Sequence, residues 1–338
     1  MNPNERYFRH TVAAIGGTLV LFLTFLWLFQ IGIGLLYEVL SQILFSPIAR
    51  DVAYSLCYCV GYLASFMLPV LLLKLLIQRR GFAYRPMRVK LQVSAWWLLA
   101  VPACIAIVFA ASHVNAALTD IFTPFPSVED LLGGDVTPAP ALHKVVLSFM
   151  TVCVVPGFCE EFLFRGAVLE NLLPFGRTNA ILISALLFAL AHQTPSQAFY
   201  AFAAGIVLGL VYERTRSILP VTLMHIFNNL ASVLLDLISH RAPTDAKSGV
   251  YLLVFELTML FVGVLSIAAL IRRFGMREKS FEDGVFGVGD ESVDAEPACP
   301  ITRSAAIKTF LQPLMLIFIV FCAVQILTTM FLNGSALR

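Results

Sequence analysis

Nine apolar stretches, most of them long enough to cross a lipid bilayer, recur along this chain of 338 residues. The hydrocarbon core of a membrane is about 30 Å thick, so a spanning helix needs about 20 mainly apolar residues. The candidate spans are residues 11–36, 52–78, 92–112, 143–172, 179–193, 197–212, 218–238, 250–271 and 310–332. This pattern predicts an all-α fold, a polytopic membrane helix bundle of about nine transmembrane helices, with eight as the alternative.

The composition excludes other classes of protein. Hydrophobic residues make up 59% of the chain and charged residues only 13%, which no soluble domain could bury and no disordered chain would show. The net charge of +2 argues against a nucleic-acid partner, which would require a basic face. The 7 cysteines lie mostly in apolar runs without a C-x-x-C pair, so we interpret them as small core residues.

The lysines and arginines are distributed unevenly between alternate loops. If the N-terminus is cytoplasmic, the inside segments hold 18 of the 23 basic residues and the outside segments hold the other 5. Cytoplasmic loops carry such an excess, so the split predicts a multi-pass protein of the cell membrane with a cytoplasmic N-terminus. Arg6 and Arg9 precede an apolar stretch that is too long for a signal peptide, which favours a retained anchor.

Three regions follow from the predicted helices and the long loops between them. Residues 1–142 hold the first three spans, a basic cytoplasmic loop and a proline-rich external loop at 113–142. Residues 143–240 form a central core of helices. Residues 241–338 hold the last two spans, joined by an acidic segment at 273–309 that we interpret as a flexible cytoplasmic linker.

Most ionisable residues inside apolar stretches fall in the central core, and each is a candidate functional group because charge is costly in a bilayer. They form three short motifs: Glu160-Glu161 with Arg165, Phe188 with His192, and His225 with Asn229. Residues four apart share a helix face, so Glu161 and Arg165 are predicted to form an ion pair. Glu160 points about 100° away and lacks a partner nearby in the sequence. An unpaired carboxylate in a low-dielectric site is suited to act as a general base.

Counting from the turns places the motifs at similar depths in the membrane. Glu160 lies 16 residues before Gly176, and His192 lies 16 residues after it. In straight antiparallel helices both residues would be about 24 Å from the turn. By the same measure His225 and Asn229 lie roughly 14 and 20 Å deep. The motifs are therefore predicted to meet within one membrane layer.

The helix that carries His192 is predicted to end soon after that residue. His192 stands three residues before Pro195, and the stretches 179–193 and 197–212 are short for a full crossing. The connecting residues 194–196 would dip into the membrane, which is tolerated only inside protein or beside a water-filled cavity. A hydrolase that works in a membrane needs such a cavity.

Taken together and in this order, the three motifs resemble the signature of the CPBP family, also called the Abi or type II CAAX-prenyl-endopeptidase-like family. That signature is E-E-x-x-x-R, then F-x-x-x-H, then H-x-x-x-N or H-x-x-x-D, and all three parts are present. The resemblance covers residues 143–240 and implies an intramembrane endopeptidase. It implies that Glu160 and His192 activate the attacking water, while His225 and Asn229 stabilise the tetrahedral oxyanion.

The resemblance gives other motif residues supporting roles. Glu161 and Arg165 would hold the first helix in register, whereas Phe188 is most simply a packing residue. Asn228 competes with Asn229 for the polar role, but only Asn229 has the i+4 spacing from the preceding histidine. We therefore prefer Asn229.

The metal dependence of such an enzyme is left open by the residues. Glu160, His192 and His225 offer two nitrogens and one oxygen, a composition known from catalytic zinc sites. The H-E-x-x-H motif is absent, however, and Asn229 is a poor zinc ligand. We prefer a metal-free, glutamate-dependent mechanism over one with a divalent metal such as Zn, although the family is often labelled metalloprotease.

The predicted function is hydrolysis of a peptide bond in a membrane-associated protein or peptide, as in CAAX-type processing or peptide maturation. One alternative is a non-catalytic scaffold or chaperone that would depend on the small-residue stripe of Ala201, Gly205 and Gly209. The other is a transporter, which the absence of a second half-length repeat disfavours. The sequence assigns no role to Asp236 or Glu256.

Overall fold

The computed structural model describes residues 3–79, 81–82, 84–90, 95–122, 141–241, 245–282 and 311–335. Every regular element in these ranges is a helix. Eight α-helices are continuous there: α1 (Pro3–Ile43), α2 (Pro47–Arg79), α3 (Trp97–Phe122), α8 (Arg177–Ala191), α9 (Pro195–Thr215), α10 (Ile218–Arg241), α11 (Asp245–Glu282) and α13 (Pro313–Ser335). A ninth helical segment, Leu142–Phe175, joins α3 to α8 in sequence order.

The ninth segment is an interrupted helix. Its pieces are α5 (Leu142–Ser148), the π-helix η1 (Phe149–Val154), α6 (Val155–Glu161), the π-helix η2 (Phe162–Leu169), α7 (Glu170–Leu172) and the 3₁₀ turn η3 (Leu173–Phe175). The assumption of a straight helix through Glu160 is therefore wrong. π-Helical turns inside longer helices often occur at functional sites, and here two of them flank the Glu160-Glu161 pair.

The nine helical segments of the described chain coincide with the nine predicted spans, so the all-α polytopic bundle is confirmed. Seven of them are long and apolar enough to cross a membrane. The other two, α8 and the Pro313–Thr329 part of α13, are apolar but shorter. A short α8 agrees with the prediction that its helix ends just after His192.

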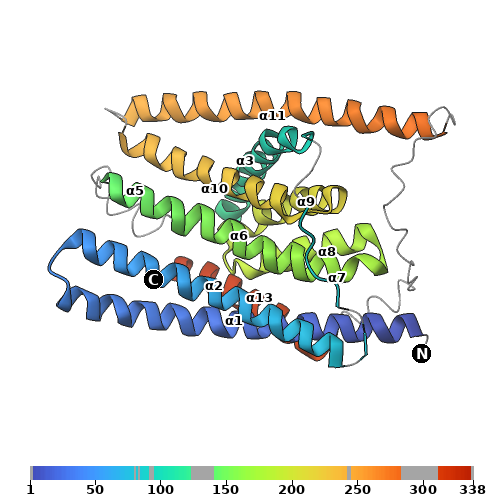
Figure 1. Cartoon of the computed structure of the whole chain (residues 1–338). Helices are drawn as coiled ribbons and strands as arrows, with labels where there is room; N and C mark the ends of the chain where they lie inside the picture. The colour runs from blue at the N-terminus through green and yellow to red at the C-terminus, as the bar shows by residue number, and fades with distance from the viewer. Residues whose placement is uncertain are drawn as a thin grey trace.

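The long helices α1, α2, α10 and α11 lie roughly parallel (Figure 1). α1 packs along α2, and α13 packs against α1. On the other side of the bundle α3 contacts both α11 and α9, and α9 also contacts α8. α6 lies between these groups and contacts both α2 and α10. The element that carries Glu160 is thus placed inside protein.

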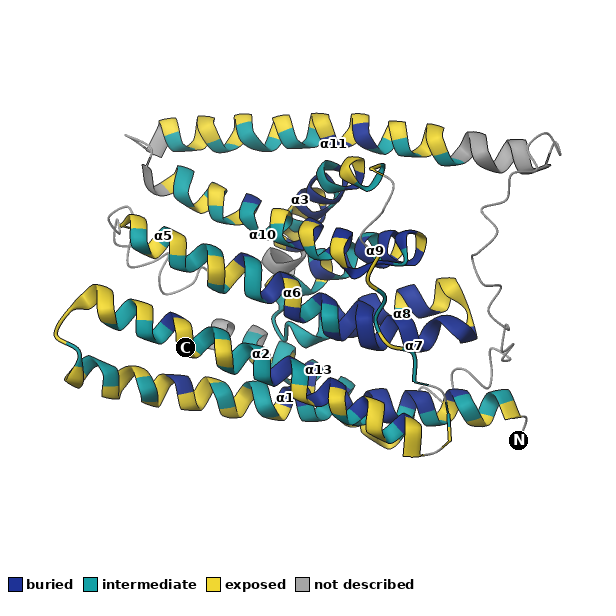
Figure 2. Cartoon of the chain, in the orientation of Figure 1, coloured by how far each residue is buried: buried dark blue, intermediate teal, exposed yellow. Residues whose placement is uncertain are grey.

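Many residues on the outside of the bundle are exposed (Figure 2), and large apolar side chains are among them as well as in the interior. Val254, Leu257 and Phe261 on α11 are each more than half exposed. Such a surface would be costly in water, but it is the surface that a helix presents to lipid. The chain is therefore an integral membrane protein, and its main buried core includes residues of η2, α8 and α9.

Small residues allow α8 and α9 to approach closely. A Cβ atom added to Gly205 would lie 2.9 Å from the Cα atom of Ala185, and one added to Gly209 would lie 3.0 Å from Cγ2 of Ile181. Ala201, in the same stripe, is almost completely buried. The stripe of Ala201, Gly205 and Gly209 is therefore a helix-packing face.

The connection between α8 and α9 is as short as the sequence predicted. His192 is the C-cap of α8, and Gln193 adopts a left-handed conformation with φ of 56°. Thr194 is extended, and Pro195 begins α9. The left-handed residue ends the helix abruptly, which leaves His192 at the end of α8.

Both long loops are shorter than predicted, because the flanking helices extend into them. α3 runs to Phe122, inside the predicted external loop 113–142, and α11 runs to Glu282, inside the predicted linker 273–309. Residues 123–140 and 283–310 lie outside the described residues, so the remainder of both predictions falls there.

Residues 84–90 form an extended strap across the ends of several helices, a feature that the sequence did not predict. Asn171 accepts a hydrogen bond from the Arg85 backbone N–H and donates to the Arg85 carbonyl, both at 3.0 Å. The Ser217 hydroxyl makes the same two contacts with Lys90, at 3.1 and 3.0 Å. Burial raises the pKa of the Tyr84 phenol, and the charge of a nearby carboxylate raises it further. The strap thus joins the ninth segment to the α9–α10 turn.

Candidate active site

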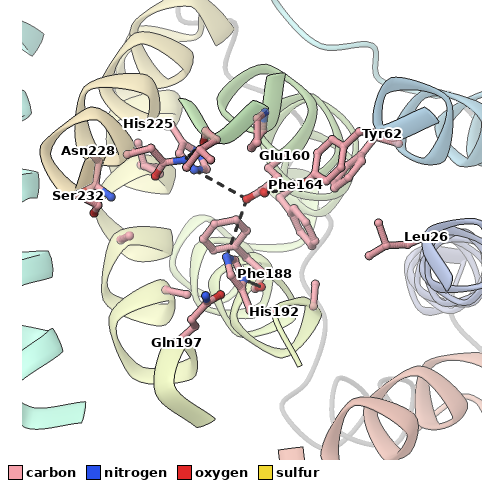
Figure 3. Close-up of a pocket in the computed structure, with 18 of the residues that line it drawn as sticks. Leu26, Tyr62, Glu160, Phe164, Phe188, His192, Gln197, His225, Asn228 and Ser232 are labelled. Carbon is pink, nitrogen blue, oxygen red and sulfur yellow. Dashed lines mark hydrogen bonds and ion pairs between the residues drawn. The ribbon is translucent and has the colours of Figure 1, made fainter. Parts of the chain in front are cut away.

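Residues from all three motifs line one partly open cavity of about 500 Å³ (Figure 3). The cavity lies among α1, α2, α3, η1, α6, η2, α8, α9 and α10. Its polar lining includes Tyr62, Glu160, His192, His225, Asn228 and Asn229. The prediction that the motifs meet in one layer is therefore confirmed, even though the helix through Glu160 is not straight.

The two oxygens of the Glu160 carboxylate have different surroundings (Figure 3). Oε1 accepts a hydrogen bond from the Tyr62 hydroxyl, with an O···O distance of 2.8 Å. Oε2 lies 3.8 Å from Nε2 of His225 and 4.0 Å from Nε2 of His192. Oε2 is buried and has no hydrogen-bond partner among the described residues. Oε2 is therefore the oxygen whose lone pairs are not engaged by the described part of the chain.

Hydrogen bonds at Nδ1 fix the orientation of both histidine rings. Nδ1 of His192 lies 2.8 Å from the carbonyl oxygen of Phe188, and Nδ1 of His225 lies 2.8 Å from Oε1 of Glu161. A carbonyl and a carboxylate only accept, so each Nδ1 must carry the hydrogen. In the neutral rings both Nε2 atoms then present a lone pair on the side of Oε2 of Glu160.

Glu161 pairs with Arg165 and also orients a histidine. Oε1 of Glu161 accepts from Nη1 of Arg165 at 2.8 Å and from Nδ1 of His225. Both members of the pair are fully buried. The guanidinium also donates to the Gly205 carbonyl at 3.3 Å and lies 4.5 Å from the centroid of the Phe188 ring. The predicted i,i+4 ion pair is confirmed, and its contacts reach α8, α9 and α10 as well.

Phe188 does more than the packing that the sequence suggested. Its ring meets those of His192 and His225 edge to face, with centroids 4.7 and 6.0 Å apart. Its carbonyl accepts the hydrogen of the His192 ring. The residue therefore holds both imidazoles from the apolar side of the cavity.

Asn229 fastens α10 to the interrupted helix. Its Nδ2 atom donates to the carbonyl of Val152 at 2.9 Å. Pro156, four residues after Val152, has no N–H to offer that carbonyl. Asn228 lines the same cavity, and its Oδ1 atom is buried without a hydrogen-bond partner among the described residues. The cavity thus contains both amides, and one amide hydrogen of Asn229 is already used.

Comparison with known families bears on the same part of the chain. Residues 142–231 match the family model described as type II CAAX prenyl endopeptidase Rce1-like. Over this segment the chain is similar to that family. The match confirms the resemblance drawn from the three motifs, and it includes Glu160, His192, His225 and Asn229. No curated protein and no solved structure gives a significant match to the chain.

The candidate ligands for a metal ion in this cavity are Glu160, His192 and His225. Oε2 of Glu160 and the two Nε2 atoms are chemically suitable ligands for Zn. The part of the chain that the structure describes nevertheless brings together no group of three His, Cys, Asp or Glu side chains that could hold a metal ion. The described side chains are therefore not arranged as a metal site in this structure.

Tyr62, which hydrogen-bonds to Glu160 in the cavity, lies outside the segment that matches the Rce1-like family and was not predicted from the sequence. Tyr62 belongs to α2, and an aromatic residue in an apolar helix is ordinarily assigned to packing. Tyr54, Tyr58 and Tyr62 are spaced four apart and therefore share one face of the helix. A phenol hydroxyl inside a membrane needs a hydrogen-bond partner, and that need was the signal available in the sequence.

Proposed function

We propose that the protein is an intramembrane endopeptidase that hydrolyses a peptide bond of a membrane-associated protein or peptide. The observation that carries the proposal is the unpartnered oxygen of Glu160, which faces two oriented imidazoles across a cavity within the bundle. An uncompensated carboxylate within a membrane is costly and is retained where it has a function. The match to the Rce1-like family supports the same activity.

In the proposed reaction a water molecule lies between Oε2 of Glu160 and Nε2 of His192. Glu160 takes a proton from the water as the new C–O bond forms at the scissile carbonyl carbon. The proton on Glu160 then passes to the leaving amide nitrogen as the C–N bond breaks. General base catalysis of this kind contributes about 10²- to 10⁴-fold to a rate.

The negative charge that develops on the carbonyl oxygen needs hydrogen-bond donors. We assign these to His225 and Asn229. His225 can donate from Nε2 when its ring carries both hydrogens, since Glu161 accepts the hydrogen at Nδ1. Asn229 keeps one amide hydrogen beyond the one it gives to Val152. Removal of one such donor typically costs about 10²- to 10³-fold in kcat.

The proposed orientation places the N-terminus in the cytoplasm and the protein in the cell membrane. The N-terminal end of α1 and the strap lie at the same end of the bundle, the right-hand end in Figure 1. Both carry basic residues, in agreement with an excess of positive charge on the cytoplasmic side. The substrate is proposed to enter the cavity from the lipid bilayer.

The deciding experiment is cleavage of membrane-tethered peptides by the purified protein in liposomes. The parent chain is expected to release products, whereas Glu160→Gln, which keeps the size of the side chain, should release none above background while retaining the parent's thermal midpoint. Glu256→Gln is the control, because Glu256 pairs with His113 at 3.3 Å and does not line the cavity. Full cleavage by folded Glu160→Gln would contradict the proposal.

Two further outcomes separate the alternatives. Activity that survives exhaustive chelation supports the metal-free mechanism, and loss of activity that Zn restores would establish a metal enzyme. A scaffold would keep its cellular function in Glu160→Gln. A transporter would instead move an ion across liposomes that contain the parent protein and cleave nothing.

A further inference from the structure

We propose that Tyr62 is a positioning residue that fixes which oxygen of Glu160 acts as the base. The inference rests on the proposed function and extends it to α2, a helix outside the segment that matches the Rce1-like family. Tyr62 contributes no atom to the reaction in this proposal. It acts through the carboxylate.

A hydrogen bond joins the side chains of Tyr62 and Glu160. The Tyr62 hydroxyl donates to Oε1 of Glu160 at 2.8 Å, across 98 residues of sequence. Figure 3 shows the ring directed from α2 toward the carboxylate, on the side opposite the histidines. Oε1 is therefore occupied, and Oε2 is turned toward the two Nε2 atoms, 3.8 and 4.0 Å away.

The ring that carries this hydroxyl is itself held in place. Tyr62 packs against Phe66 with ring centroids 4.7 Å apart and stacks on Tyr58 with centroids 5.7 Å apart. Phe66 is buried in the core and packs against Phe22 of α1. The hydroxyl therefore has a fixed position relative to the cavity.

A carboxylate needs such a contact because its two oxygens are otherwise equivalent. Rotation about the last side-chain bond of a glutamate exchanges them, and that torsion has broad, roughly two-fold preferences. A hydrogen bond from a neutral donor to an ionised acceptor is short and strong. One such bond at Oε1 therefore selects a single orientation and leaves the lone pairs of Oε2 directed at the proposed water.

The test compares Tyr62→Phe with Tyr54→Phe in the liposome cleavage assay. Phenylalanine keeps the ring and its stacking and removes only the hydroxyl. Tyr54 lies two turns earlier on the same face of α2 and does not line the cavity, so it is the matched control. For each variant kcat, KM and the thermal midpoint are measured on a peptide that the parent cleaves and Glu160→Gln does not.

Tyr62→Phe is expected to lower kcat by about 10- to 100-fold, the effect of one hydrogen bond to a charged group. KM should stay within about twofold, because the substrate does not contact the hydroxyl in this proposal. The thermal midpoint should match that of Tyr54→Phe, whose kcat should equal that of the parent.

Three results for Tyr62→Phe would overturn the inference. They are an unchanged kcat with an unchanged KM, an unchanged kcat with a raised KM, or a fall in thermal midpoint that accounts for the lost activity. The second would make Tyr62 a substrate contact, and the third would make it a structural residue. Cleavage by the parent but not by Glu160→Gln keeps the proposed function whatever Tyr62→Phe does. If the parent cleaves no tethered peptide, both proposals fail together.

Discussion

Glu160 and Glu170 lie ten residues apart on the same interrupted helix, yet their surroundings are opposite. Each accepts a hydrogen bond from a tyrosine, Tyr62 at 2.8 Å and Tyr212 at 3.0 Å. Glu170 is completely buried and in addition has arginine partners, whereas Glu160 faces only imidazoles across a cavity. The difference separates a carboxylate that holds the fold from the one that we propose as the general base.

Three arginines surround Glu170 at the end of the bundle that the strap crosses. Nε of Arg88 lies 3.1 Å from Oε1, and Nε of Arg85 lies 3.8 Å from the same oxygen. Nη1 of Arg216 lies 3.9 Å from Oε2. Arg85 and Arg88 belong to the strap, so this cluster fastens the strap to the helices. The negative charge of this buried carboxylate is thus paired with positive charge inside the fold.

The comparison is tested most strongly by making the same change at both glutamates. Glu160→Gln is expected to lower cleavage by about 10²- to 10⁴-fold and to leave the thermal midpoint unchanged. Glu170→Gln should do the reverse, because it leaves three guanidinium groups without their carboxylate. Its free energy of unfolding should fall by about 3–5 kcal/mol. Thermal unfolding in detergent, together with kcat per folded molecule, separates the two.

The opposite pattern in either variant would break the comparison. An inactive but fully stable Glu170→Gln would place Glu170 in the reaction. An unstable Glu160→Gln would make Glu160 part of the structural core.

The next largest effect is expected for the buried ion pair between Glu161 and Arg165. Arg165→Lys keeps the positive charge opposite Glu161 but loses the planar fork that also reaches the Gly205 carbonyl. The free energy of unfolding should fall by about 1.5–3 kcal/mol, the value of a hydrogen bond to a charged group. Cleavage should fall as well, because Glu161 orients His225. An Arg165→Lys protein with the parent's stability and rate would show that the pair is dispensable.

A smaller effect is expected where α8 and α9 pack together. Gly205→Ala places a methyl group 2.9 Å from the Cα and Cβ atoms of Ala185, and such overpacking costs about 1–3 kcal/mol. Gly32→Ala is the control, because a Cβ atom there meets nothing within 4 Å. The thermal midpoints of both variants are compared with that of the parent. Equal midpoints for Gly205→Ala and the parent would mean that the two helices can move apart at no cost.

The smallest effect is expected at a carboxylate that is paired but partly exposed. Oδ2 of Asp51, near the N-terminal end of α2, lies 3.1 Å from Nε2 of His143 and 3.9 Å from Nζ of Lys144. Asp51→Asn should change the free energy of unfolding by no more than about 1 kcal/mol, as for exposed ion pairs generally. A change as large as that of Glu170→Gln would show that pairing outweighs burial.

Several parts of the fold and site were predictable because they depend on local sequence. The spans follow from the length of each apolar stretch, and all nine were located. The Glu161–Arg165 pair follows from i,i+4 spacing on one helix. The meeting of Glu160 with His192 follows from equal distances to one turn, and the two π-helices did not disturb it.

Other parts were not predictable, because they depend on groups that are distant in the sequence. The strap is an extended segment whose hydrogen bonds go to Asn171 and Ser217, and nothing in its own residues specifies those partners. The π-helices are local departures from helical periodicity that a pattern of apolar residues does not record. The use of one Asn229 hydrogen by Val152 depends on how α10 lies against η1.

The sequence by itself determined which segments enter the membrane and which polar side chains they carry with them, because both follow from the cost of transferring each residue into lipid. Only the tertiary structure decided which of those side chains are neutralised. Arg88 approaches Glu170 across 82 residues, and Tyr62 approaches Glu160 across 98. Charge compensation acts over a few ångströms in space regardless of separation along the chain, so only the packing of the helices could leave Glu160 without a cationic side chain of its own.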